Sequence, residues 1–360
     1  MRATTQLHEL GQSIWLDNIT RAMLDSGQLA AYIDEYSVTG LTSNPSIFDK
    51  AIASGGYDDA IRAKAATSID RESLFFELAI EDLRRAADAF RPVHERTAGL
   101  DGWVSLEVSP LLAYDPDTTV RVATELHAAA DRPNLLIKIP GTPEGLPAVE
   151  AAIAAGIPVN VTLLFSADQY RAAADAFMRG IERRVAAGQQ PVVGSVASVF
   201  MSRWDVAVND AVPEHLRDTL ALAVGLQVYR AYREVMESER WQRLKNSGAR
   251  MQRLLWASTS TKNPAAPDDL YVACLGAPFT VNTVPEGTLR AFYDHGRTPE
   301  PMPTDGGSST TTLAEFAAAG VDVTALATEL QSKGAASFVD AWNDLLSRID
   351  AQRAAVEGTG

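Results

Sequence analysis

A lysine stands in an apolar stretch of the sequence where a charged side chain is unexpected. Lys138 lies in residues 135–140 (LLIKIP), and its neighbours on both sides are aliphatic. In a parallel sheet covered on both faces, such a strand places the ammonium in a dry interior, which lowers its pKa from the usual value of about 10.4. A neutral amine beside a cavity can attack a carbonyl carbon and form a Schiff base. The alternatives are a lysine that reaches solvent at a strand edge and one paired with a carboxylate.

Two carboxylates stand in similarly apolar stretches. Asp17 ends residues 13–17 (SIWLD), and Glu107 lies within residues 103–108 (WVSLEV). Two carboxylates and a lysine that face one cavity could divide acid and base catalysis between them. The structural alternatives are that Asp17 caps the helix that follows and that Glu107 forms an ion pair with Lys138.

Two asparagines add neutral amides to this set. Asn160 lies inside an apolar run, where a buried amide needs hydrogen-bond partners. Asn44 precedes Pro45, which by itself is typical of a turn or a helix start. Because an amide both donates and accepts hydrogen bonds, the pair suits the hydroxyl and carbonyl groups of a polyol.

Three further residues are candidates for binding an anion. We expect a helix to open at Ser198, so that its backbone N–H groups, the Ser198 hydroxyl and the Arg203 guanidinium meet one anion. Lys262 follows the seventh predicted strand and is a second candidate cation. The alternative is that Arg203 and Lys262 form ordinary ion pairs on the surface.

Eight short β-branched or apolar runs alternate with stretches of helical period, which is the pattern of repeated βα units. The predicted strands are residues 13–16, 38–42, 103–108, 134–139, 158–165, 191–195, 254–258 and 279–284. Helical patterns cover residues 117–130, 166–187 and 214–237, and the wide gaps 45–101 and 198–253 must hold inserted helices. The sequence therefore predicts an α/β fold, a closed (β/α)8 TIM barrel with functional groups at the C-terminal strand ends.

A turn-rich segment, residues 299–309, separates this barrel from a helical tail. Apolar residues recur there at helical spacing: Phe338, Ala341, Trp342, Leu345, Leu346 and Ile349. One stripe of the tail must therefore be buried. We predict a catalytic barrel domain over residues 1–300 and a C-terminal helical extension over residues 301–360 that packs on it.

The composition disfavours several other functions. The 360-residue chain has a formal net charge of −14, which opposes binding to nucleic acid or to anionic membranes. The usual glycine motifs of dinucleotide and nucleoside triphosphate sites are missing, and the five histidines lack metal-ligand spacing. The single cysteine, Cys274, predicts a buried inert thiol. Residues 1–12 are polar and show no secretory signal, so we expect a cytoplasmic protein without a bound metal.

Three motifs, taken together and in order, resemble those of the transaldolases. They are residues 40–48 (GLTSNPSIF), 135–140 (LLIKIP) and 159–166 (VNVTLLFS). Further positions that match the family are Asp17, Ser105, Glu107, Ser198 and Arg203. The resemblance runs from about residue 10 to about residue 290. It implies a class I aldolase-like barrel that moves a dihydroxyacetone unit between sugar phosphates without a cofactor.

By this resemblance, the enzyme would convert sedoheptulose 7-phosphate and glyceraldehyde 3-phosphate into erythrose 4-phosphate and fructose 6-phosphate, in the non-oxidative pentose phosphate pathway. Lys138 would form the Schiff base with the ketose. Asp17 would take and return the proton of the hydroxyl beside the carbon–carbon bond that breaks. Glu107, with Thr162 and a water molecule, would move protons as the carbinolamine loses water.

The resemblance also implies a set of binding residues. The dihydroxyacetone unit and the Schiff base would be surrounded by Asn44, Asn160, Ser105 and Thr42. The phosphate would be bound by Ser198 and Arg203, with Phe200 as a nearby aromatic residue. Lys262 departs from the pattern, because many relatives carry an arginine there, and a lysine lacks the bidentate fork of a guanidinium. Residues 140–145 (PGTPEG) also differ from several relatives.

Two alternatives remain beside transaldolase. One is an aldolase of the same scaffold that releases free dihydroxyacetone, as fructose 6-phosphate aldolase does, and the other is a non-catalytic sugar-phosphate-binding protein. The carboxylates Asp17 and Glu107 favour transfer over release, and their presence together with Lys138 favours catalysis. We expect a monomer or a homodimer, with no nucleic-acid or membrane partner.

Overall fold

Eight parallel strands form a closed barrel in the computed structural model, which describes residues 2–65 and 70–357. Each strand pairs with the next one along the chain, and β8 pairs with β1. The strands are β1 (Ser13–Asp17), β2 (Val38–Thr42), β3 (Val104–Glu107), β4 (Leu135–Pro140), β5 (Val159–Leu164), β6 (Ser195–Phe200), β7 (Gln252–Ala257) and β8 (Val281–Val284). The predicted (β/α)8 barrel is confirmed.

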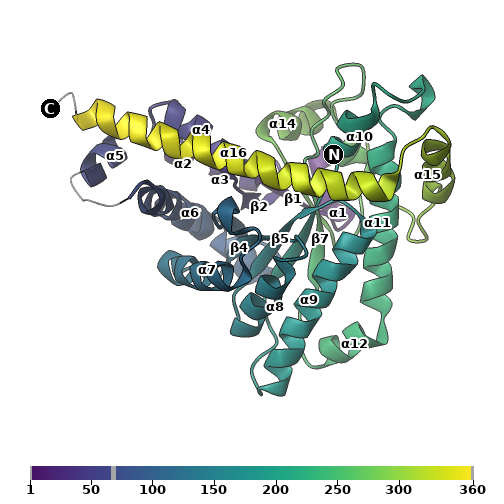
Figure 1. Cartoon of the computed structure of the whole chain (residues 1–360), viewed down its shortest axis with the longest axis horizontal. Coiled ribbons are helices and arrows are strands. Elements are labelled where there is room, and N and C mark those ends of the chain that lie inside the picture. Colours follow the sequence, from purple (N-terminus) through teal and green to yellow (C-terminus); the bar gives the residue numbers. More distant parts are fainter. Residues whose placement is uncertain (1, 66–69, 358–360) are drawn as a thin grey trace.

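Helices surround the barrel and fill the wide gaps between strands, as expected (Figure 1). The first half of the chain contains α1 (Ala3–Glu9), α2 (Arg21–Asp25), α3 (Gln28–Glu35), α4 (Pro45–Ala53), α5 (Asp58–Ala65), α6 (Arg71–Arg96), the 3-10 helix η1 (Pro110–Leu112), α7 (Pro116–Ala130), α8 (Leu146–Ala155) and α9 (Ala167–Ala186). The second half contains α10 (Ser202–Val208), the 3-10 helix η2 (Glu214–Leu216), α11 (Leu220–Glu237), α12 (Glu239–Asn246), α13 (Leu270–Cys274), α14 (Glu286–His295), α15 (Ser309–Ala318) and α16 (Val323–Glu357). None of the described helices is long and apolar enough to span a lipid bilayer.

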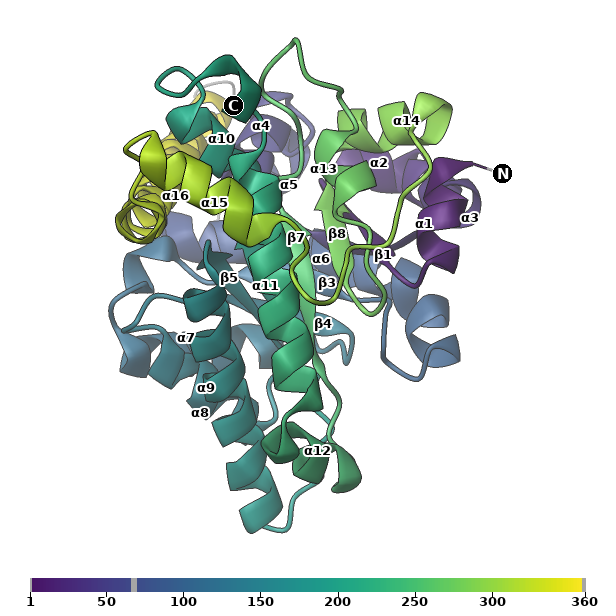
Figure 2. The same ribbon diagram turned by 90° about the vertical axis from the view of Figure 1, so that its right-hand side faces the viewer.

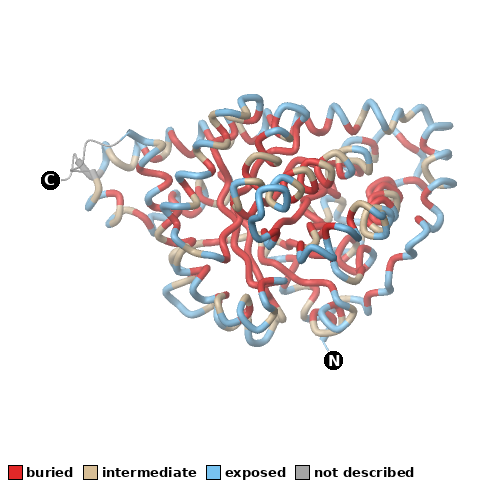
Figure 3. The backbone as a smooth tube through the Cα atoms, turned by 90° about the horizontal axis from the view of Figure 1, so that it is seen from below, coloured by how far each residue is buried: buried red, intermediate tan, exposed pale blue. Residues whose placement is uncertain are grey.

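The barrel strands form the centre of the core. Every residue of β4 and of β5 is buried, because the helices cover their outer faces and the barrel interior covers their inner faces. Figure 3 shows this buried backbone gathered in the middle of the molecule. A polar residue on these strands, such as Lys138 or Asn160, is therefore buried by the fold itself.

The sixth strand lies further along the chain than predicted. The prediction was residues 191–195, whereas β6 spans Ser195–Phe200. Gly194 explains part of the shift, because a Cβ at this position would lie 2.3 Å from Cζ2 of Trp103, so the segment before β6 approaches this ring closely. The expectation that a helix opens at Ser198 is consequently wrong. Ser198 lies within β6, and α10 begins only at Ser202.

The tail packs along the barrel as two helices. α15 contacts α11, and the long helix α16 contacts α4, α5, α6 and η1, so that it crosses the molecule from one side to the other (Figure 1). Figure 2, turned by 90°, shows α15 and α16 on the side of the barrel away from α1 and α3. The predicted stripe is buried at Phe338, Trp342, Leu345, Leu346 and Ile349.

A buried polar network lies at the N-terminal ends of the strands, which we call the floor of the barrel. The Arg253 guanidinium donates to Oγ of Ser13 and to the carbonyl of Thr280, both at 2.7 Å, and lies 3.8 Å from the Asp101 carboxylate. Asp101 in turn accepts hydrogen bonds from the Trp15 indole at 2.7 Å and from the Ser13 hydroxyl. The floor thus surrounds a buried ion pair with protein hydrogen bonds.

Candidate active site

Three functional side chains lie side by side because three neighbouring strands are in register. Glu107 of β3 is opposite Lys138 of β4, and Lys138 is opposite Asn160 of β5. Residues in register on parallel strands point to the same face, so these side chains share the barrel interior near the C-terminal strand ends. This end, which we call the mouth, is where the sequence places the candidate residues.

Lys138 and Glu107 form a buried ion pair at the mouth. Nζ of Lys138 lies 3.1 Å from Oε2 of Glu107, and the side chains are only 7% and 4% exposed. Burial raises the pKa of the Glu107 carboxyl above its ordinary value, and the positive charge of Lys138 partly opposes this shift. The second carboxylate oxygen, Oε1, and the hydroxyl of Thr162 are buried and have no hydrogen-bond partner among the described residues. The ion pair considered as the alternative for Glu107 is therefore present, but it uses only one of the carboxylate oxygens.

Asp17 lies on the opposite wall of the mouth. Its carboxylate accepts a hydrogen bond of 2.8 Å from Thr42, whose hydroxyl also lies 2.6 Å from that of Thr283. Burial raises the pKa of the Asp17 carboxyl, and the charge of Lys138 and the hydrogen bond from Thr42 oppose the shift. The alternative of a helix cap is wrong, because Thr20 caps α2. A carboxyl whose pKa is raised holds a proton more readily and is suited to exchange it with a substrate.

The two asparagines have different surroundings. Asn160 donates to Oγ of Ser105 at 3.1 Å and accepts from Ser198 at 2.6 Å, so a chain of hydrogen bonds links β3, β5 and β6. Asn44 caps α4, since its Oδ1 accepts from the backbone N–H of Ile47 at 3.1 Å. The helix-start interpretation of Asn44 is thus confirmed, although the residue also lines the mouth.

Two cations at the mouth lack carboxylate partners among the described residues. The Arg203 guanidinium is half-buried, and its carbon lies 5.1 Å from the ring centroid of Phe200 and 5.9 Å from that of Phe338. Burial lowers the pKa of Arg203, although a guanidinium stays charged in proteins. Nζ of Lys262 is exposed and donates to Oγ of Ser260 at 2.6 Å. A half-buried cation without a counter-ion is suited to bind an anionic ligand.

These groups surround one cavity of about 230 Å³. The predicted residues in its lining are Asp17, Thr42, Asn44, Lys138, Asn160, Thr162, Ser198, Phe200, Arg203 and Lys262. Glu107 and Ser105 stand behind this lining and reach it through Lys138 and Asn160. Lining residues that the sequence did not indicate are Ser46, Ala257, Ser258, Ser260, Thr283, Pro285, Ser337 and Phe338. Phe338 belonged to the predicted apolar stripe, but that pattern signals burial and not what the ring covers.

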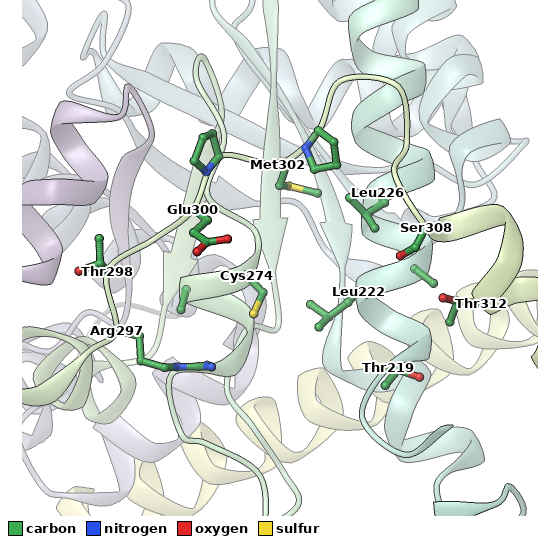
Figure 4. Close-up of a pocket in the computed structure, with 14 residues that line it drawn as sticks. Thr219, Leu222, Leu226, Cys274, Arg297, Thr298, Glu300, Met302, Ser308 and Thr312 are labelled. Atoms are coloured by element: carbon green, nitrogen blue, oxygen red, sulfur yellow. The ribbon is translucent and has the colours of Figure 1, made fainter. Parts of the chain in front are cut away.

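A larger cavity of about 750 Å³ lies outside the barrel, where α11 faces α13 and the segment before α15 (Figure 4). The Arg297 guanidinium that lines it is already paired with Asp269 at 2.7 Å. Cys274 also faces this cavity and is exposed, so the prediction of a buried thiol is wrong. The reason is that α13 is short and buries Tyr271, Val272 and Ala273 but not its last residue. None of the predicted site residues lies here.

The structure offers no alternative metal centre within residues 2–65 and 70–357, where no group of three or more His, Cys, Asp or Glu side chains could hold a metal ion.

Comparison with known proteins gives full-length matches. A family model described as Transaldolase/Fructose-6-phosphate aldolase matches residues 14–349. A protein of Thermobifida fusca (strain YX) named transaldolase is 46% identical over 362 residues, which cover 97% of this chain and 98% of that protein. Transaldolases of Parafrankia sp. (strain EAN1pec) and Neisseria gonorrhoeae (strain ATCC 700825 / FA 1090) are 44% and 42% identical, and each alignment covers 97% of this chain and 97% and 100% of the relative.

Proposed function

This chain belongs to the transaldolase/fructose-6-phosphate aldolase family, and from that premise we propose that it is a transaldolase that forms a Schiff base on Lys138. Its substrates are sugar phosphates, and the transferred group is a three-carbon dihydroxyacetone unit. The observation that carries the proposal is the row of Glu107, Lys138 and Asn160 on three strands in register, beside one cavity that Arg203 also lines without a carboxylate partner among the described residues.

The first step needs a neutral amine. Glu107 lies 3.1 Å from Nζ of Lys138, and its raised pKa suits it to take the ammonium proton. The free amine then attacks the ketose carbonyl, and the carbinolamine that forms loses water to give the Schiff base. Departure of that water needs a proton, which Glu107 can return. The unpartnered Oε1 of Glu107 and hydroxyl of Thr162 support a water molecule as the carrier.

Carbon–carbon cleavage needs a base on the other wall. Asp17 takes the proton of the hydroxyl next to the breaking bond, the aldehyde product leaves, and the electron pair of the bond moves into the Schiff base. The three-carbon unit stays attached to Lys138 until an acceptor aldehyde arrives, and Asp17 then returns the proton. Its raised pKa supports both halves of this exchange.

Binding is divided between amides and cations. We assign the hydroxyls of the three-carbon unit to Asn160 and Asn44, with Ser105 and Thr42 beside the Schiff base. We assign the phosphate to Arg203, Ser198 and Lys262, with Phe200 as the aromatic neighbour of Arg203. Lys262 contributes a point charge without the bidentate geometry of an arginine.

A trapping experiment tests this proposal. The protein is incubated with fructose 6-phosphate and borohydride, and the site of the adduct is mapped by mass spectrometry. We expect one reduced three-carbon adduct on Lys138 and none in the Lys138→Met variant. Lys245→Met, at an exposed lysine of α12 that does not line the cavity, is the matched control and should keep the adduct. An adduct on another lysine, or no adduct, would contradict the assignment of the nucleophile.

The balance between transfer and release distinguishes this enzyme from a fructose 6-phosphate aldolase. With fructose 6-phosphate and erythrose 4-phosphate we expect sedoheptulose 7-phosphate to form much faster than free dihydroxyacetone. Comparable rates of the two reactions would indicate an aldolase. The relatives named transaldolase favour transfer over release.

We further propose that residues 1–300 and 301–360 act as one catalytic unit, because α16 contacts helices of the barrel and places Phe338 in the cavity wall. Residues 358–360 lie outside the described part of the chain. We also propose that the enzyme works in the cytoplasm, where its sugar phosphate substrates occur, and as a monomer or a homodimer.

A further inference from the structure

One face of the C-terminal helix α16 covers part of the mouth. Gln331, Gly334 and Phe338 are spaced by three and four residues, so they lie in a row along that face, and all three are buried. Each meets a different part of the site. Gln331 contacts the backbone at two strand ends, Gly334 is close to Arg203, and Phe338 lies over Lys138 and Arg203.

Gln331 fixes the height of the helix above the barrel. Its Nε2 donates to the carbonyl of Gly141 at 3.1 Å and to that of Leu163 at 2.9 Å. Gly141 follows β4, which carries Lys138, and Leu163 follows Thr162 on β5. Leu163 has a φ of 61°, a left-handed conformation that is uncommon for leucine and that turns its carbonyl out of the regular ladder. The two hydrogen bonds therefore tie α16 to the strand ends that carry the reactive groups.

Gly334 allows the helix to lie close to Arg203. A Cβ at this position would lie 3.0 Å from Cδ2 of Leu163 and 3.1 Å from Nη1 of Arg203, which is tighter than an ordinary contact. Glycine is disfavoured relative to alanine inside a helix, so its presence here fits the need for close approach.

Phe338 and Phe200 are two aromatic rings that both contact the Arg203 guanidinium, and we call this pair the aromatic clamp. The carbon of the Arg203 guanidinium lies 5.1 Å from the ring centroid of Phe200 on β6 and 5.9 Å from that of Phe338 on α16, and the two ring centroids are 6.3 Å apart. Aromatic rings attract the guanidinium face and leave the N–H groups in its plane free to bind an anion. Arg203 has no carboxylate partner in the described residues that would otherwise orient it.

We propose that Phe338 is a positioning residue for Arg203, so that the preference of this enzyme for phosphorylated sugars depends on its C-terminal helix. This inference rests on the proposed function, because the phosphate is that of the sugar substrates. Phe338 acts through Arg203 and does not itself bind the phosphate. Loss of the ring frees the guanidinium to turn away from the cavity, while the lysine and carboxylates keep their positions.

Substitution of Phe338 by leucine tests this role, because leucine keeps much of the apolar bulk but has no π face. We expect the KM for glyceraldehyde 3-phosphate to rise about 5-fold to 10-fold. The KM for unphosphorylated D-glyceraldehyde should stay within about twofold, because Lys138, which also lies under the Phe338 ring, is still held by its ion pair with Glu107, whereas Arg203 has no carboxylate partner among the described residues. Phe338→Tyr keeps the ring and should restore the low KM for the phosphorylated acceptor.

Two further measurements separate positioning from a merely structural role. Binding of inorganic phosphate to the free protein, measured by calorimetry, should weaken in Phe338→Leu by the same factor as the KM. Ile349→Ala removes a buried side chain of the same helix away from the cavity. It should lower stability without changing the KM for either acceptor or the affinity for inorganic phosphate.

The proposal is overturned if Phe338→Leu raises the KM for both acceptors equally, or if phosphate binds this variant as tightly as the parent protein. Borohydride trapping on Lys138 tests the proposed function separately. A protein that fails to trap but still loses phosphate affinity in Phe338→Leu would contradict the reaction and leave the clamp intact.

Discussion

The two ends of the barrel each contain a buried ion pair, but the two pairs differ in how many hydrogen-bond partners surround them. At the floor, the Arg253 guanidinium is surrounded by the Ser13 hydroxyl, backbone carbonyls and Asp101, and Asp101 has its own donors in Trp15 and Ser13. At the mouth, Glu107 has Lys138 as its partner on one oxygen, and its other oxygen is unpartnered among the described residues.

This difference separates stability from function within one fold. A buried charge costs free energy unless its neighbours satisfy it, and the floor satisfies both charges with protein atoms. Within residues 2–65 and 70–357, the mouth leaves Glu107 Oε1 and the Thr162 hydroxyl without hydrogen-bond partners and Arg203 without a carboxylate partner, so these groups are free to act on a substrate. Substitutions at the floor should therefore change folding, and substitutions at the mouth should change turnover.

The largest effect should follow removal of the mouth lysine. Lys138→Met leaves no amine for the Schiff base, so transfer should fall below detection in an assay that couples product formation to a dehydrogenase. The fold should survive, because Glu107 can take up a proton once its partner is gone, and circular dichroism should show unchanged secondary structure. Measurable transfer by purified Lys138→Met would contradict the assignment of Lys138 as the nucleophile.

Removal of the mouth carboxylate should slow turnover without abolishing it. Glu107→Gln should lower kcat by about 10²-fold to 10⁴-fold, the usual contribution of a general acid or base. In the parent enzyme the rate should decline as pH falls through the raised pKa of Glu107, since the carboxylate form accepts the proton. That decline should become shallower in Glu107→Gln, where Asp17 is the remaining carboxylate base. Glu300→Gln, at an exposed glutamate of the outer cavity, is the control and should leave kcat unchanged.

The floor should show the opposite pattern. Arg253→Met leaves Asp101 buried without its cation and should cost about 3–5 kcal/mol in the free energy of unfolding, measured by urea denaturation. The folded fraction should keep the parent kcat/KM. Lys138→Met should lose less stability than Arg253→Met, and equal losses would mean that the two ion pairs contribute equally to stability.

A further buried carboxyl, Asp205 on α10, sharpens the comparison because it accepts hydrogen bonds from neutral donors. It accepts from the Tyr271 hydroxyl at 2.7 Å and from the backbone N–H of Ala221 at 3.1 Å. Burial raises its pKa from 3.8 to about 6. The folded protein thus binds this proton more tightly than the unfolded chain does.

Stability should therefore fall as pH rises from about 4 to about 6, by on the order of 2 kcal/mol from this group. The amide of Asp205→Asn stays neutral at every pH, so the variant should not show the part of the stability decrease that comes from this group. The measurement is the difference in unfolding free energy between the parent protein and the variant at pH 4 and at pH 7. If the difference in unfolding free energy between parent and variant is the same at both pH values, the neutral donors stabilise the charged form of Asp205 as well as its neutral form.

The fold and much of the mouth were predictable from local patterns. Apolar runs that alternate with helical periods indicate a barrel, and a lysine or an asparagine within such a run must face its interior. Two adjacent β-branched segments surround Gly194, however, and period alone did not decide which one is β6. Because of this error, Ser198 was predicted at a helix start, whereas it lies within β6.

The particular contacts that α16 and β8 make at the mouth were not predictable. Phe338 reaches the mouth only because Gln331 and Gly334 seat α16 on the strand ends, and none of these residues carries a local signal of that contact. Thr283 joins Thr42 only when β8 closes against β1. Helical periodicity states which side of a helix is buried, whereas the partner is determined by how all the elements pack.

The position of α16 in the chain has a consequence for biosynthesis. All eight strands precede it, and proteins leave the ribosome from the N-terminus at about 5–20 residues per second. A nascent chain can thus expose Lys138, Glu107 and Asp17 before the helix that carries Phe338 has been made. We expect the reactive lysine to be assembled before the aromatic clamp over Arg203, so that substrate selection is the last property the new molecule acquires.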